Sequence, residues 1–130
     1  MAAKQKNTDL TNGESSTKQK GDKAEQIAAD YLIHKGYTVL ARNWRWQRAE
    51  LDLVCMDGNS LVIVEVKSRS YNSLGEPEES ITPAKEALLL DAARQYAYEI
   101  NHEWEVRIDI IAILMQEKSY QLRHFIDAIY

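Results

Sequence analysis

An apolar run leads into a charged end in the stretch Leu61-Val62-Ile63-Val64-Glu65-Val66-Lys67. Four consecutive apolar residues predict a central β-strand that is covered on both faces. Side chains two positions apart on a strand share a face, so Glu65 and Lys67 continue the face of Leu61 and Ile63. A carboxylate placed on such a face is costly unless it is paired or bound to a metal.

A second strand-like run, residues 50–56, lies just upstream and contains Asp52. The turn-forming residues 57–60 (Asp-Gly-Asn-Ser) separate the two runs and predict a hairpin. Folding this hairpin brings Asp52 beside Glu65, with Lys67 adjacent. Two carboxylates and a lysine at one strand end predict the centre of a metal-dependent phosphodiesterase.

Mg²⁺ is the expected cofactor, with Mn²⁺ as a substitute. Magnesium prefers oxygen ligands and retains several waters, so Asp52, Glu65, the main-chain carbonyl of Val66 and a substrate phosphate suffice. The metal would polarise the phosphate and lower the pKa of an attacking water. Lys67 would orient that water or neutralise the charge that develops on the phosphate. The simpler alternative is an ion pair between Glu65 and Lys67 on a strand surface.

The chain of 130 residues has the size of one domain. Residues 1–20 are polar and predict a disordered tail, which leaves 21–130 as the folded unit. The single cysteine, Cys55, excludes an internal disulfide and a cysteine-based zinc site. No apolar stretch is long enough to span a membrane and the N-terminus lacks a signal-peptide core, so we expect a cytoplasmic protein without a membrane partner.

The pattern of the remaining residues predicts an α/β fold. A fourth strand reached through a helix lies parallel to an earlier strand by the usual right-handed connection, which gives a mixed sheet with helices on its faces. The expected elements are a helix from Asp22 to Lys35, strands over 37–46, 50–56 and 61–67, a long loop over 68–81, a helix from the cap Thr82 to about Ile100, a strand over 105–114 and a short edge strand over 120–126.

Basic residues surround the proposed acidic centre, although the formal net charge of −4 argues mildly against a dedicated nucleic-acid coat protein. A basic rim of this kind suits an enzyme that holds phosphate and metal together, and the alternative is scattered, solvated charge. The candidate nucleic-acid contacts are Arg42, Arg45, Arg48, Arg69 and Lys85. Lys85 falls in the first turn of the second helix, where a phosphate contact and a structural lysine are equally compatible with the pattern.

The spacing of two predicts that one face of a strand carries Arg42, Trp44, Trp46 and Arg48. Arginines and aromatic rings in alternation can hold phosphates and stack bases. A half-buried strand face whose arginines extend into solvent gives the same pattern, and we favour that interpretation for the tryptophans.

Other charged residues have simpler readings. Glu50 can assist the metal or pair with Arg48, and pairing is slightly favoured. Glu25 lies at the edge of the apolar stripe of the first helix, and by itself this position predicts an ordinary helix ion pair with a neighbouring lysine. Arg107 and Asp109 share a strand face and predict a pair with each other. The three histidines have no ligand spacing and receive no role.

A set of short motifs extends over nearly the whole folded unit, from about Gly21 to Ile113. They are Gly21 to Glu25, Gly36-Tyr37, Arg42-Asn43, Glu50-Leu51-Asp52-Leu53, Val64 to Arg69, Leu74-Gly75 and Lys85. Together they resemble the YraN-like family of small bacterial proteins, most specifically in the Glu-Val-Lys block and the Glu-x-Asp upstream of it. That family is assigned to the restriction-endonuclease-like, PD-(D/E)xK, nuclease superfamily and is distantly similar to archaeal Holliday junction resolvases.

The resemblance implies an αβββαβ core with a divalent-metal nuclease site. It assigns the metal-ligand roles to Asp52 and Glu65 and the catalytic lysine role to Lys67. It also raises Glu25 to a catalytic candidate, since this residue matches the first-helix acid of the resolvase-like branch. Ala49 stands where the family usually has glycine.

Three hypotheses follow. The first is a Mg²⁺-dependent endonuclease that acts on DNA, including branched or repair intermediates, and resolvase-type cleavage would need a homodimer to supply two sites. The second is a non-catalytic nucleic-acid-binding protein that retains the nuclease fold. The third is a protein-interaction module, which only the net acidity supports.

Overall fold

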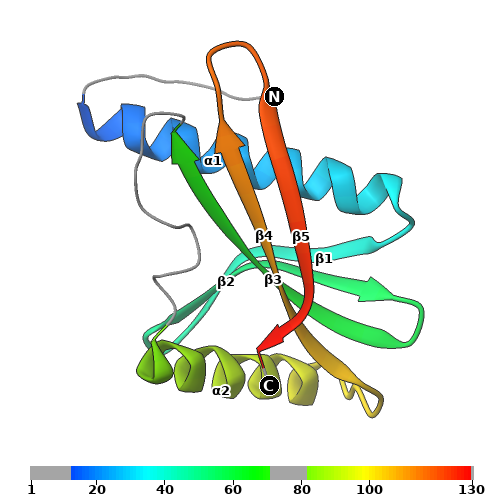
Figure 1. Cartoon of the computed structure of the whole chain (residues 1–130). Coiled ribbons are helices and arrows are strands. Elements are labelled where there is room, and N and C mark those ends of the chain that lie inside the picture. The colour runs from blue at the N-terminus through cyan, green and yellow to red at the C-terminus, as the bar shows by residue number, and fades with distance from the viewer. Residues whose placement is uncertain (1–12, 71–81, 130) are drawn as a thin grey trace, which may run out of the picture.

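A computed structural model of the chain describes residues 13–70 and 82–129, and the side chains of 21–69 and 82–129. The described part is one mixed sheet of five strands, in the order β1-β2-β3-β4-β5, with two helices (Figure 1). In chain order the elements are α1 (Gly13–His34), β1 (Thr38–Trp46), β2 (Ala49–Asp57), β3 (Ser60–Ser70), α2 (Pro83–Glu99), β4 (Val106–Met115) and β5 (Tyr120–Ile129).

This arrangement confirms the predicted α/β class and an αβββαβ-type core, with β5 added at the edge. β1, β2 and β3 form an antiparallel meander. β4 follows the α2 crossover and runs parallel to β3, from Leu61↔Val106 to Ser70↔Met115, as the sequence predicts for a strand reached through a helix. β5 pairs antiparallel with β4.

α1 is longer than its sequence predicts, because it begins at Gly13 and not at Asp22. Residues 13–20, which the sequence assigns to the tail, form the first turns of this helix, and residues 1–12 lie outside the described residues. Residues 13–20 include Glu, Lys and Gln, which favour a helix, but no apolar stripe marks them. The predicted loop is also shorter at its start, since 68–70 belong to β3 and 71–81 lie outside the described residues.

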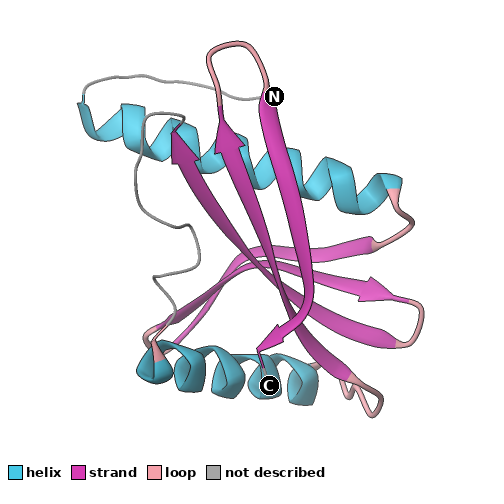
Figure 2. Ribbon diagram, viewed as in Figure 1, coloured by secondary structure: helices cyan, strands magenta, loops and turns pink. Residues whose placement is uncertain are grey.

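Two apolar clusters flank the sheet, one for each helix. On the α2 side, Leu61 and Ile63 pack with Leu89 and other residues of that helix. On the α1 side, Val62 and Val64 pack with residues of α1, Ala24, Ala28, Ala29 and Leu32 among them. The run 61–64 is fully buried, so β3 is the central strand that its apolar residues predict (Figure 2). Neither described helix has the length and apolar character that crossing a bilayer requires.

The sheet divides where β2 and β3 diverge. Their registered pairing runs from Asp57↔Ser60 to Leu53↔Val64. Past that point β2 stays paired with β1 as far as Trp46↔Ala49, while β3 stays paired with β4 as far as Ser70↔Met115. Figure 1 shows the two halves of the sheet separating in different directions. Asp52 and Glu65 are the next residues beyond the last registered pair, so both acids lie at this fork.

Candidate metal centre

The two acids at the fork take over hydrogen bonds that main-chain carbonyls accept elsewhere in the sheet. Asp52 Oδ2 accepts a hydrogen bond of 2.8 Å from the Val66 N–H. Glu65 Oε2 accepts a longer one, 3.4 Å, from the Asp52 N–H. The hairpin therefore brings the two carboxylates to the same place from neighbouring strands, as the sequence predicts.

Glu65 is the more deeply placed of the two acids. It is 4 % exposed and continues the face of Leu61 and Ile63 toward α2. Burial, and then the nearby Asp52 carboxylate, raise the pKa of Glu65 to about 8. Burial also raises the pKa of Asp52 to about 6, although the hydrogen bond from the Val66 N–H acts in the opposite direction. Each carboxylate is destabilised in its charged form, which a cation bound between them would relieve.

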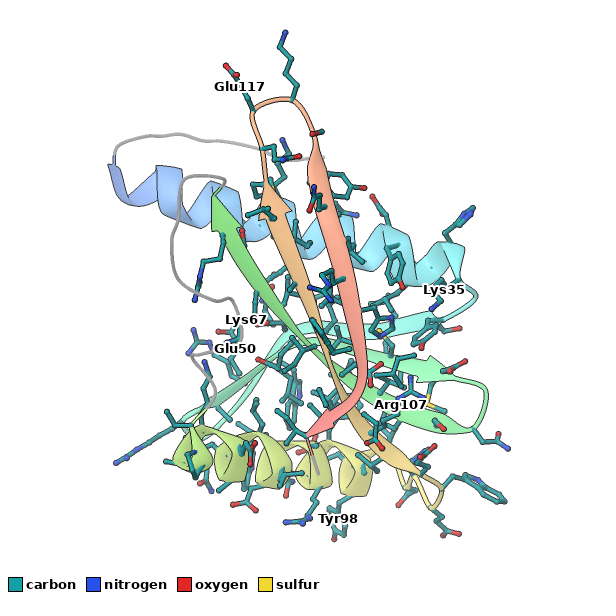
Figure 3. The ribbon with its side chains drawn as sticks, in the orientation of Figure 1. Lys35, Glu50, Lys67, Tyr98, Arg107 and Glu117 are labelled. Carbon is teal, nitrogen blue, oxygen red and sulfur yellow. The ribbon has the colours of Figure 1, made fainter. Side chains whose placement is uncertain are left out.

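Two lysines approach the carboxylates from different elements. Lys67 follows Glu65 on β3 and is half-buried, and burial and then the neighbouring Lys85 ammonium lower the pKa of its amine. Lys85 comes from the first turn of α2, where its N–H donates to Thr82 Oγ1 at 3.2 Å and so closes the helix cap. The structure thus places Lys85 beside Lys67 and not apart from the centre. Figure 3 shows Lys67 at the margin of the sheet where β2 and β3 diverge.

Two further acids lie near Asp52. Glu25 of α1 accepts a hydrogen bond of 3.1 Å from the Asn43 side chain, and its charge raises the pKa of Asp52. Glu50 also raises that pKa, and its ion-pair partner is Arg45, at 3.4 Å, and not Arg48 as the sequence suggests. The structure therefore places Glu25 and Glu50 at the rim of the centre, one from α1 and one from β2.

The candidate DNA-binding residues lie in different surroundings. Arg42 donates to Gln26 of α1 at 2.9 Å. Arg48 and Lys85 line one groove of about 370 Å³ between the start of β2 and the start of α2. Arg69 is half-buried on β3, and one guanidinium nitrogen donates to the Ser68 carbonyl at 3.3 Å. Arg48 and Lys85 thus share a groove with Glu50, and Arg69 lies two residues beyond Lys67 on β3. Arg42 instead points toward α1.

The tryptophans serve the core, which confirms the favoured interpretation. Trp44 and Trp46 pack against the α2-side cluster, and the Trp44 ring meets the Tyr96 ring edge-on at 5.1 Å between centroids. The expected single face with Arg42 is wrong because Asn43 has a φ of 51°, which interrupts the alternation of the strand. Arg42 therefore faces α1 while Trp44 faces α2.

The oxygen atoms at the fork fit a hard divalent cation that keeps part of its water shell. Among the residues that the structure describes, no three His, Cys, Asp or Glu side chains converge to hold a metal by themselves. The protein donors would be Asp52, Glu65 and the Val66 carbonyl. The last of these faces Asp52 because the N–H and C=O of one strand residue point to the same side. Such a set resembles a magnesium site completed by water and substrate more than a closed, all-protein cage.

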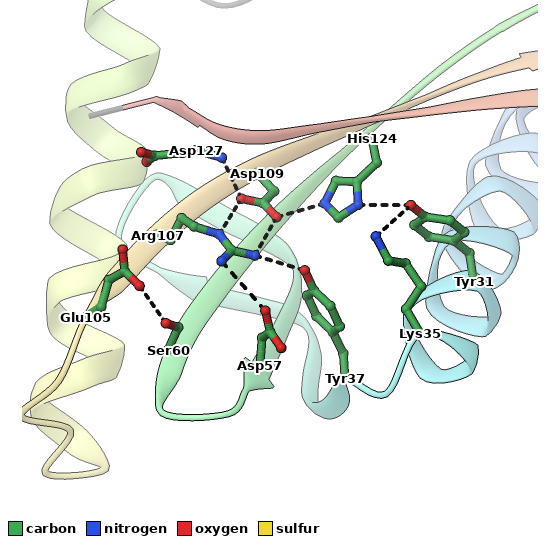
Figure 4. A network of polar contacts seen from close by, with 10 residues as sticks. All are labelled: Tyr31, Lys35, Tyr37, Asp57, Ser60, Glu105, Arg107, Asp109, His124 and Asp127. Carbon is green, nitrogen blue, oxygen red and sulfur yellow. Dashed lines mark hydrogen bonds and ion pairs between the residues drawn. The ribbon is translucent and has the colours of Figure 1, made fainter.

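A second buried polar cluster, which the sequence predicts only in part, lies on the α1-facing side of the sheet, the side opposite to Glu65 (Figure 4). Asp109 is fully buried on β4, and the Arg107 guanidinium donates to both of its carboxylate oxygens, at 2.9 and 3.1 Å. This confirms the predicted pair. His124 of β5 adds a contact of 2.7 Å to the same carboxylate, and its other ring nitrogen lies 3.1 Å from the Tyr31 hydroxyl on α1.

This cluster joins elements rather than forming an open site. Arg107 also donates to the Tyr37 hydroxyl at 2.9 Å and lies 3.7 Å from Asp57. Burial raises the pKa of Asp109, but the hydrogen bonds from His124, Arg107 and the main chain outweigh it and hold this pKa below its ordinary value. The sequence alone does not indicate a role for His124, because its position opposite Ile111 follows from the register of β5 on β4.

Comparison with known proteins identifies a family. The profile of the uncharacterised protein family UPF0102 matches residues 24–113. A UPF0102 protein of Flavobacterium psychrophilum is 40 % identical over 110 residues, which is 85 % of this chain and 92 % of that protein. A UPF0102 protein of Chlorobium limicola is 41 % identical over 115 residues, covering 83 % of this chain and 89 % of that protein. A relative from Natranaerobius thermophilus is 42 % identical over 115 residues, covering 85 % and 97 %.

The family profile includes every residue of the fork, and the matches to the relatives extend over most of the chain and of each relative. They confirm the resemblance that the Glu-x-Asp and Glu-Val-Lys motifs indicate. The chain belongs to the UPF0102 family, the YraN-like family of small bacterial proteins.

Proposed function

We propose that the protein is a divalent-metal-dependent endonuclease that acts on DNA. The observation that carries this proposal is the pair Asp52 and Glu65 at the fork between β2 and β3, with Lys67 and Lys85 beside it. Two carboxylates held together away from water favour a bound cation. Two ammonium groups on the same side favour an anionic substrate, and a phosphodiester satisfies both requirements.

Asp52, Glu65 and the Val66 carbonyl would hold Mg²⁺ or Mn²⁺. Bound there, the ion would polarise the scissile phosphate and lower the pKa of an attacking water. The Lys67 ammonium lies beside the acids, where it neutralises charge that develops on the phosphate. Lys85, which is exposed, adds a second positive charge from α2 that acts to lower the pKa of Glu65.

DNA is the proposed polymer because basic residues continue from the centre in two directions, to Arg48 in the turn just before β2 and to Arg69 on β3. The resolvase-like resemblance supports branched or repair intermediates as substrates, and a homodimer would supply the paired cuts that resolvase-type cleavage needs. A cytoplasmic location belongs to the same proposal.

A specific observation favours a non-catalytic DNA-binding protein as the second candidate. The two carboxylates already accept N–H groups of Val66 and Asp52 that the diverging strands leave without carbonyl partners. Such bonds would keep both acids useful to the fold after loss of catalysis.

A cleavage assay with Mn²⁺ on linear, flap and four-way-junction DNA separates the two candidates. The endonuclease predicts cuts by the wild type and a loss of at least about a hundredfold in Glu65→Gln and in Lys67→Ala. Glu99→Gln, an exposed acid near the end of α2, is the matched control and should cut normally. Metal-independent DNA binding without cleavage, equal in wild type and Lys67→Ala, would favour the second candidate.

A further inference from the structure

One face of the sheet continues from the acidic centre to the edge strand β5. α1 covers the opposite face, where Ile111, Ile113 and Leu122 pack with its residues. α2 lies across the other end of the sheet, and Figure 1 shows α1 passing behind β3, β4 and β5 while the near face of their upper halves carries neither helix. The side chains on this near face therefore form a surface that begins at the proposed metal centre.

Cross-strand pairing fixes which residues stand on that face. The first row is Glu65, Ile110 and Phe125. The second row is Lys67, Ala112 and Arg123, and the third is Arg69, Leu114 and Gln121. Paired residues on adjacent strands point to the same side of a sheet. Arg123 and Phe125 on β5 thus share the face of the catalytic candidates on β3.

The chemistry of these rows is basic and aromatic. Lys67 and Arg69 on β3 and Arg123 on β5 supply three cations, and Glu65, within the centre itself, is the only acid in the three rows. Phe125 is 39 % exposed, and the Arg123 guanidinium lies over its ring, 5.4 Å from the centroid. An exposed aromatic ring with an arginine beside it provides a stacking surface and a phosphate contact in one place.

We propose that this face is the binding surface for the DNA strand that enters the centre, with Arg123 contacting a backbone phosphate and Phe125 stacking a base. The inference rests on the proposed nuclease function and extends it to β5. Neighbouring strands lie about 4.8 Å apart, so Arg123 stands about 10 Å from Lys67 across β4. That span corresponds to roughly three nucleotides along one strand of duplex DNA, at about 3.4 Å each.

Charge and composition favour a nucleic-acid strand over a protein partner. The centre of a protein interface is depleted of charged residues. Here cations stand in two of the three rows, beside the small and apolar side chains of β4, as expected for a surface that tracks a phosphate backbone. The single aromatic group stands one row from the phosphate-binding candidates, which suits a stacked base.

The test uses two substitutions on β5 and two matched controls on α2. Arg123→Gln removes the charge, and Phe125→Leu keeps an apolar side chain but removes the stacking ring. Arg94→Gln and Tyr98→Leu change an exposed arginine and an exposed tyrosine on the outer side of α2. Fluorescence anisotropy with labelled single-stranded and four-way-junction DNA in EDTA gives the affinity as a function of salt. The cleavage assay with Mn²⁺ is run separately on the same proteins.

Arg123→Gln should weaken binding of single-stranded DNA about five- to tenfold and reduce the slope of log K against log salt by about 0.7. Phe125→Leu should weaken binding about fivefold or more, with little change in that slope. The controls should bind as the wild type does. Wild-type affinity in both β5 variants would overturn the inference, as would a change in oligomeric state with unchanged DNA affinity, which would make this face a contact between copies.

The two proposals fail in different ways. Arg123-dependent binding without any cleavage by the wild type supports the DNA surface and counts against the nuclease. Normal cleavage and binding in Arg123→Gln and Phe125→Leu would leave the nuclease standing and remove the surface. Absence of DNA binding by the wild type would overturn the surface directly.

Discussion

Glu65 carries the largest electrostatic cost among the residues of the fork. Its carboxylate is nearly inaccessible to water, and the charge that acts on it most strongly is that of another carboxylate, Asp52. The lysines nearby offset this cost only in part, since the pKa of Glu65 stays raised. We therefore propose that this buried acid serves to bind a cation more than to stabilise the fold.

The first prediction concerns Glu65→Gln and pH. Because the pKa of Glu65 is about 8 in the folded protein and 4.5 is its ordinary value, the folded state binds this proton more tightly than the unfolded state. The free energy of unfolding should therefore fall as pH rises from about 5 to 8, by on the order of a few kcal/mol. Glu65→Gln should lose most of this fall. Urea unfolding in EDTA at pH 5, 6.5 and 8 measures it, and an identical pH dependence in the variant contradicts it.

The second prediction concerns Asp109, whose role is structural. Asp109→Asn leaves the Arg107 guanidinium, whose side chain is 12 % exposed, without its charged partner and should cost about 3–5 kcal/mol. Because the pKa of Asp109 is lowered, its contribution is present above pH 3.8 and is lost as pH falls through the lowered value. Asp91→Asn, which removes an exposed ion pair with Arg94, should cost no more than about 1 kcal/mol. Equal effects of the two variants in chemical unfolding at pH 7 would argue against the network.

At the scale of the elements, apolar periodicity predicts the buried strands and misses segments that carry no regular apolar pattern. The run 61–64 identified the central strand, and the turn 57–60 identified the hairpin that joins Asp52 to Glu65. The sequence does not predict the first turns of α1, because residues 13–20 contain no apolar residues at helical spacing. β5 extends past the expected end at Ile126 to Ile129, through a residue of positive φ, Asp127, that no period-two pattern predicts.

The sequence likewise predicts only part of the candidate site. Asp52, Glu65 and Lys67 are linked by one short hairpin, so local sequence is enough to bring them together. Lys85 and Glu25 reach the fork only because α2 and α1 dock on the sheet, and that docking depends on contacts between residues far apart in the chain. His124 needs the register of β5 on β4 in addition.

The third prediction belongs to α2, whose first turn carries Lys85. Thr82→Ala removes the side-chain oxygen that accepts the Lys85 N–H and should destabilise the protein by about 1 kcal/mol. Frayed at this end, α2 should hold Lys85 less firmly beside Lys67, so DNA affinity should fall together with stability. Thr82→Ser keeps the hydroxyl and is the control. Thermal unfolding and anisotropy on both variants check this, and a Thr82→Ala protein as stable as Thr82→Ser would show that the cap contributes nothing.

Across the whole molecule, the sheet is the frame that joins the two polar clusters. On the face that α1 covers, the Asp109 network ties β4 and β5 to α1 and to the β1–β2 half of the sheet. On the opposite face Glu65 stands where β2 and β3 diverge, and side-chain carboxylates replace the ladder between these strands. The Asp109 network has its charges paired and supports stability. The fork leaves two acids close together, and we propose that it binds a cation.

The most direct test of the proposed cation site at the fork needs no assumption about the DNA substrate. Isothermal titration of Mn²⁺ into the protein at pH 8 should show saturable binding near one ion per chain for the wild type, as roughly expected for carboxylate sites completed by water. Glu99→Gln should bind as the wild type does, and Glu65→Gln and Asp52→Asn should bind at least about tenfold more weakly. Equal Mn²⁺ binding in wild type and Glu65→Gln, or none in the wild type, would contradict a metal centre at the fork.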